Sequence, residues 1–115
     1  MFIALAFLTL APAQNQLAEK PANLTSSMVS EAWAEISWDA VETAVAYKIE
    51  IRKTAADGKI NLQLEEKTVW TEFYFRVADP KATWEFRVSA IGYDHHESWT
   101  NWTTLKTDAA ISFKY

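Results

Sequence analysis

The chain has 115 residues, a formal net charge of −4 and an isoelectric point near 5.1, and 50% of its residues are hydrophobic. This length and apolar content fit one domain with one core. The acidic balance disfavours nucleic acid, because a phosphate-binding face needs clustered lysine and arginine. The absence of cysteine excludes disulfides and thiol chemistry.

The chain begins with an apolar run, from Phe2 to Ala13, followed by a polar linker at residues 14–20. A bilayer span needs about 20 apolar residues, so this run is too short for one. Its length and its terminal Ala-Pro-Ala predict a secretory signal peptide at residues 1–13. Since no basic residue precedes it, a second interpretation is a retained polymerisation segment made of Phe2, Ile3, Leu5, Phe7, Leu8 and Leu10.

Beyond Pro21, apolar and polar residues alternate in several short stretches, and this period of two predicts strands with one buried face. Turns are expected at Ser26–Ser30 and at Asp57-Gly58, the second being a hairpin sequence. The expected core residues are Ile36, Trp38, Tyr47, Ile49, Ile51, Phe73, Phe75, Trp84, Phe86 and Val88.

The most informative stretch follows Pro80, which lies four residues before Trp84. Apolar residues then recur at every second position as far as Ala90, and Gly92 follows. The stretch resembles strand F of a fibronectin type III domain, whose usual pattern is Leu-x-Pro-x-x-x-Tyr-x-Phe-x-Val-x-Ala. Members of this family usually bind partners or act as spacers, and they rarely catalyse reactions.

The resemblance covers about residues 21–107. It implies an all-β fold, a seven-stranded Greek-key β-sandwich of fibronectin type III type, with room for an extra strand at one or both termini. Residues 108–115 contain a further alternation and predict an additional C-terminal strand.

Two positions depart from the family pattern. Trp84 stands where the family has a corner tyrosine, so its indole N–H must find an acceptor in place of the phenol O–H. Ala78 stands at an inward position where the family has leucine, which implies a smaller core volume at that end.

The segment Trp99-Thr-Asn-Trp102-Thr, just before the expected last strand, is similar to the Trp-Ser-x-Trp-Ser box of class I cytokine receptors. Strand alternation directs Lys48, Arg52 and Arg87 to the solvent face, which predicts a cation–π ladder of these three cations with the two indoles. The favoured interpretation is a structural stack. A receptor-like binding face and an aromatic ligand platform are the alternatives.

Other aromatic and apolar residues are candidates for a partner surface, because exposed large aromatics are frequent at interfaces. Trp33 should face opposite to Ile36, and either it or Trp70 could instead pack on a neighbouring loop. Stacking on sugar rings is disfavoured because no polar cluster accompanies the rings. The candidate partner surface is Trp33, Trp70, Ile111, Phe113 and Tyr115.

No catalytic, metal-binding or cofactor-binding residue is predicted. His95 and His96 are adjacent in a loop, and a shared metal would need a contorted backbone. The glycine-poor sequence contains no phosphate loop.

The sequence therefore predicts a secreted or cell-surface, non-enzymatic module for interaction, adhesion or spacing, whose partner is another protein or an identical subunit. The alternative is a structural subunit of an extracellular filament that polymerises by strand addition through its apolar termini.

Overall fold

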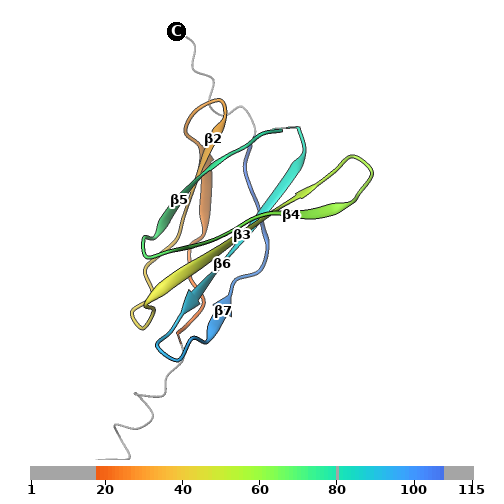
Figure 1. Cartoon of the computed structure of the whole chain (residues 1–115). Helices are drawn as coiled ribbons and strands as arrows, with labels where there is room; N and C mark the ends of the chain where they lie inside the picture. Colours follow the sequence, from red (N-terminus) through yellow and green to blue (C-terminus); the bar gives the residue numbers. More distant parts are fainter. Residues whose placement is uncertain (1–17, 80, 108–115) are drawn as a thin grey trace, which may run out of the picture.

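Two antiparallel sheets make up the part of the chain that the computed structural model describes, residues 18–79 and 81–107 (Figure 1). The described residues form eight strands and no helix. The predicted signal peptide or polymerisation segment at 1–13 and the predicted strand at 108–115 lie outside the described residues.

The smaller sheet has three strands in the order β1-β2-β5. Its members are β1 (Thr25–Met28), β2 (Trp33–Ser37) and β5 (Glu72–Arg76). The strands β1 and β5 are the edges of this sheet, so each has one side without a described neighbour.

The larger sheet contains five strands. They are β3 (Ala46–Thr54), β4 (Ile60–Thr68), β6 (Thr83–Ile91), β7 (Glu97–Trp99) and β8 (Thr103–Thr104). The order is β4-β3-β6-β7, and β8 also pairs with β6. Since β7 and β8 both pair with β6, they are two pieces of one interrupted edge strand.

This arrangement confirms the predicted all-β sandwich, with the last of the seven strands split in two. The chain changes sheet between β2 and β3, between β4 and β5, and between β5 and β6. The predicted Asp57-Gly58 hairpin joins β3 to β4, where Gly58 has a φ of 85° that suits glycine and Ala55 N–H donates to the Lys59 carbonyl at 2.8 Å.

The core lies between the sheets and is built from residues that alternate along β2, β3, β5 and β6. Residues predicted from the alternation and found buried are Ile36, Trp38, Tyr47, Ile49, Ile51, Phe75, Trp84, Phe86 and Val88. Phe73 was expected in the core but is half-buried and packs against it from the side. The reason is that β5 is an edge strand, so no described strand covers the outer side of this ring.

Two predictions at strand ends were wrong. Val77, not Ala78, faces inward: Val77 is buried and its N–H donates to the Ala32 carbonyl at 2.7 Å, so the alternation of β5 continues one residue beyond the strand. The expected turn at Ser26–Ser30 is largely strand β1, because small polar residues form an edge strand there and the turn follows Met28.

The packed domain also begins earlier than the predicted boundary at Pro21. Ala18, expected within the polar linker, is buried in the core, and its carbonyl accepts a hydrogen bond from the Ser98 hydroxyl at 2.5 Å.

The corner before β6 is closed by an indole. The Trp84 Nε1–H donates to the Asp79 carbonyl oxygen at 2.7 Å, which supplies the acceptor that the sequence required. The Trp84 ring also contacts Phe75 edge to face, with centroids 5.2 Å apart. One side chain therefore fills core volume and ties the loop between the sheets to β6.

Replacing Trp84 should separate these two contributions. We expect Trp84→Ala to lower the free energy of unfolding by about 3–5 kcal/mol, the usual cost of emptying a buried aromatic site. Trp84→Phe keeps a ring but leaves the Asp79 carbonyl without its donor and should cost about 1–3 kcal/mol. Urea unfolding measures both, with the exposed Tyr93→Ala as control. A Phe variant as stable as the parent chain would contradict the role of the corner hydrogen bond.

Candidate functional site

An alternating stack of arginines and tryptophans covers the outer face of the larger sheet. The Arg87 guanidinium carbon lies 4.2 Å from the ring centroid of Trp99 and 4.8 Å from that of Trp102, and the Arg52 guanidinium carbon lies 4.0 Å from that of Trp102. The order is Trp99, Arg87, Trp102, Arg52, and we call this set the arginine–tryptophan ladder. Each cation gains attraction from the ring faces beside it.

Carboxylates on neighbouring strands hold the two arginines in place. Arg87 Nε donates to Glu50 Oε1 at 2.7 Å, and Arg52 Nε donates to Glu85 Oε1 at 2.8 Å. Both pairs lie directly opposite each other in the register of β3 with β6. Glu50 is 9% exposed, so the ion pair with Arg87 offsets the cost of burying its carboxylate.

Lys48 was expected in the ladder, but the structure does not bring it against a ring. Its Nζ instead forms an ion pair with Glu97 Oε2 at 3.0 Å, and Glu97 Oε1 accepts a hydrogen bond from Trp99 Nε1 at 3.1 Å. The hydrogen bond between the two charges raises the pKa of Lys48 and lowers the pKa of Glu97. Lys48 therefore supports the ladder through Glu97 rather than through cation–π contact.

The geometry of the ladder favours a structural role over a binding platform. Arg87 lies against both indoles, Arg52 lies against Trp102, and both rings are half-buried. Little free ring surface is left for a ligand to stack on. The ladder links β3, β6 and β7 to the segment before β8, so it fastens the interrupted edge strand to the sheet.

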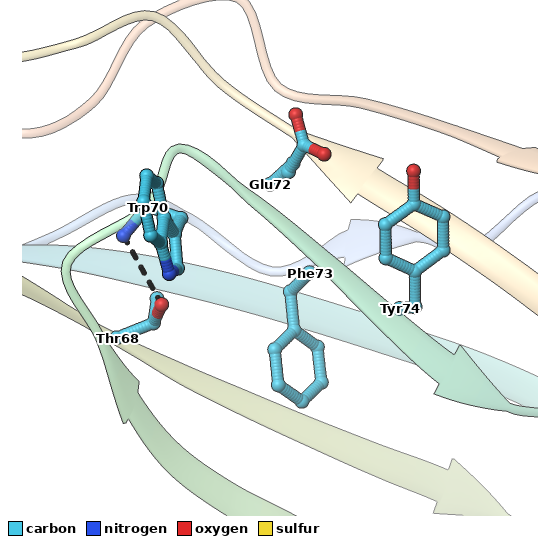
Figure 2. A pocket seen from close by; sticks show the side chains of 5 residues that line it. All are labelled: Thr68, Trp70, Glu72, Phe73 and Tyr74. Atoms are coloured by element: carbon cyan, nitrogen blue, oxygen red, sulfur yellow. Dashed lines mark hydrogen bonds between the residues drawn. The ribbon is translucent and has the colours of Figure 1, made fainter.

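A second aromatic surface lies at the β5 side of the smaller sheet, where the chain arrives from β4. Trp70 is 71% exposed, although its position is fixed by a hydrogen bond from its backbone N–H to the Thr68 hydroxyl at 3.1 Å. It borders an open hollow of about 550 Å³ (Figure 2). The lining residues are Thr68, Trp70, Glu72, Phe73 and Tyr74.

Because side chains alternate along β5, the residues that line this hollow point to opposite faces of the strand. Figure 2 shows the Phe73 ring pointing to the opposite side of the strand from Glu72 and Tyr74. Sequence reasoning named Trp70 as a surface residue but missed the other members. The sequence signal that could have found them is the run of bulky residues at positions 72–76.

Trp33, the other described member of the predicted partner surface, lies apart from this hollow. It is 43% exposed and pairs with Arg76 at the far end of β5, whereas Trp70 precedes the near end. Five extended residues span about 17 Å, so the two indoles do not form one patch. The remaining members, Ile111, Phe113 and Tyr115, lie outside the described residues.

Tyr74 joins the hollow to β2 through its hydroxyl, which donates to Glu35 Oε2 at 2.9 Å. This hydrogen bond, together with the negative charges of Glu35 and Glu72, raises the pKa of Tyr74 above 10.0. The outer face near Tyr74 is thus acidic.

Among residues 18–79 and 81–107, no group of three or more histidine, aspartate and glutamate side chains is placed to hold a metal ion. His95 and His96 lie in the turn between β6 and β7, where the His96 carbonyl accepts a hydrogen bond from Gly92 N–H at 3.1 Å. None of the described segments forms a helix of the length and apolarity that a membrane span requires.

No family model and no curated protein sequence matches the chain. Solved structures do resemble it. The FN5 domain of Drosophila Lar has a TM-score of 0.58 at 14% identity, with 76% of this chain and 96% of that chain covered. An Fn3-like protein from Clostridium thermocellum has a TM-score of 0.61 at 18% identity, with coverage of 79% and 94%. The fn3 domain of human collagen alpha-1(XX) chain has a TM-score of 0.58 at 16% identity, with coverage of 84% and 92%.

These likenesses define the class of the fold as an immunoglobulin-like β-sandwich. More closely, the chain forms a domain of the fibronectin type III fold, as the sequence resemblance predicted.

The structural role of the ladder can be tested at its central cation. We expect Arg87→Ala to lower the free energy of unfolding by about 1–3 kcal/mol, because it removes two ring contacts and leaves the Glu50 carboxylate without its partner. Adding Glu50→Ala should recover part of this loss, since the unpaired charge is then gone. Urea melts of the two single variants and the double variant measure the coupling. A coupling of zero would show that the pair does not hold the ladder.

The Tyr74 hydrogen bond should make the stability of the domain depend on pH in the alkaline range. Ionisation of Tyr74 would remove its hydrogen bond to Glu35, so the stability that this bond adds is present at neutral pH and is lost as pH rises through the raised pKa. Glu35→Gln should bring the pKa of Tyr74 down towards 10.0, as measured by NMR titration of its ring signals. An unchanged pKa in Glu35→Gln would contradict this assignment.

Proposed function

We propose that the chain is a non-enzymatic interaction module that works outside the cell or at its surface and contacts another polypeptide through the β5 side of the smaller sheet. The observation that carries this proposal is Trp70, which exposes 71% of its surface beside an apolar hollow while its backbone is fixed. Large, solvent-exposed aromatic side chains contribute much of the binding energy at many interfaces.

The fold supports the same proposal. Several of the structures that resemble the chain are fibronectin type III domains, a fold common in adhesion and spacer modules. The ladder contributes rigidity, because it fixes four side chains across the outer face of the larger sheet. A rigid scaffold that presents an aromatic residue loses little conformational freedom on binding.

A filament subunit that polymerises through its apolar termini is the second candidate. The edge strands β1, β4 and β5 each have a side without a described neighbour that could accept a strand, which is the observation in its favour. Assembly by this route would depend on residues 1–13 or 108–115, and it would be lost on their removal.

Site-specific photocrosslinking tests the proposed surface. p-Benzoylphenylalanine in place of Trp70 should give a discrete covalent adduct with another polypeptide when the chain is irradiated in the cells that produce it. The matched control places the same group at Tyr93, which is 88% exposed in the turn after β6. Adducts at position 93 but not at position 70, or none at either, would refute the proposed surface.

A further inference from the structure

On one side of β5, the backbone hydrogen-bonding groups have no partner strand among residues 18–79 and 81–107. Val77 N–H donates to the Ala32 carbonyl, and Trp38 N–H donates to the Thr71 carbonyl. In an antiparallel pair, residues that face the partner strand alternate with residues that face away. The odd-numbered residues of this segment therefore bond to β2, and the N–H and C=O groups of Glu72, Tyr74 and Arg76 point to the open edge.

This edge carries few of the features that usually block strand addition. The β5 strand contains no proline or glycine, and its register with β2 runs without a bulge from Glu72 to Arg76. Its protection rests on the charges of Glu72 and Arg76, which is a common defence of edge strands. Neither side chain forms an ion pair within residues 18–79 and 81–107.

The sequence of β5 is self-complementary about its central residue. In an antiparallel pairing of two copies centred on Tyr74, Glu72 of one copy lies opposite Arg76 of the other. The same pairing brings the two Tyr74 residues together and sets Phe73 opposite Phe75 on the inner face. Opposite-charge and aromatic cross-strand pairs each stabilise a sheet, so the charges that repel other edges attract a second copy.

The pairing also places partners beside the exposed aromatic rings. Phe73 is half-buried, since no described strand covers its outer side, and a second β5 would supply one. Trp70 lies two residues before Glu72, and Arg76 of the second copy would reach it diagonally across the edge, where residues are about 7–8 Å apart. The cation could then contact both the indole and the carboxylate.

We infer that the chain forms a two-fold symmetric dimer in which β5 of one copy pairs antiparallel with β5 of a second copy, centred on Tyr74. The two smaller sheets would join into one continuous sheet in the order β1-β2-β5-β5-β2-β1. This inference rests on the proposed function, since it identifies the partner of the β5 surface as a second copy of the chain. Such an interface is isologous, with each patch contacting its own counterpart.

Charge reversal tests the pairing without touching the core, because Glu72 and Arg76 are both exposed. In sedimentation equilibrium of the full chain, Arg76→Glu or Glu72→Arg alone should raise the dimer dissociation constant at least about tenfold, through repulsion between like charges. The double reversal restores opposite charges and should return the constant to within about threefold of the parent. The matched control for Arg76→Glu is Lys59→Glu, which also replaces a positive with a negative charge but lies on the hairpin between β3 and β4. It should leave the dissociation constant unchanged.

A second variant tests whether the two-fold axis of the dimer passes through Tyr74. The chain has no cysteine, so Tyr74→Cys introduces a single thiol. Hydrogen-bonded antiparallel residues have Cα atoms about 5.5 Å apart, which a disulfide can span. Tyr74→Cys should form a covalent dimer in air, whereas Trp33→Cys, on the same face but away from the axis, should give little covalent dimer although it still associates. In the parent dimer, the amides of Glu72, Tyr74 and Arg76 should exchange more slowly with solvent than in the monomer.

The outcomes separate the inference from the proposed function. Failure of Tyr74→Cys to crosslink, or single and double charge reversals with equal effects, overturns the dimer. If the photocrosslinker at position 70 still captures a different polypeptide, the interaction surface stands and only its partner is wrong. If the photocrosslinker also captures nothing, both proposals fail.

Discussion

The structure depends on β6, which is covered on both faces and paired on both sides. Phe86 and Val88 on one face have no exposed surface, and Ser89 on the other face has none either. The inner residues hold the core together, while Arg87 on the outer face anchors the ladder. Because β3 lies on one side and β7 and β8 on the other, the larger sheet is organised around this one strand.

Local alternation predicted most of the core and the outward direction of Arg52 and Arg87, because a period of two fixes which face a side chain occupies. It could not predict that Lys48 pairs with Glu97, since this contact joins β3 to the start of β7 across β6. Nor could it predict that Phe73 is half-exposed, which follows from the place of β5 at a sheet edge. Both outcomes depend on strand order, and strand order is decided by the whole fold.

The two sheets use their polar and aromatic residues in opposite ways. In the larger sheet, Arg52 and Arg87 have carboxylate partners on adjacent strands and rings to stack on, so this face is satisfied within the molecule. In the smaller sheet, Glu72 and Arg76 on β5 lack ion-pair partners among the described residues. The ladder thus stiffens the larger sheet, while the proposed recognition surface lies on the smaller sheet.

The tryptophan at the corner before β6 has a chemical consequence of its own. A phenol in that place carries a proton that strong alkali can remove, and with it would go the ability to donate to the loop carbonyl. The indole N–H of Trp84 does not titrate in this range, so its bond to the Asp79 carbonyl persists in alkali. The closure of this corner therefore does not depend on the ionisation of a side chain, whereas alkali that ionises Tyr74 removes its hydrogen bond to Glu35 on the β5 face.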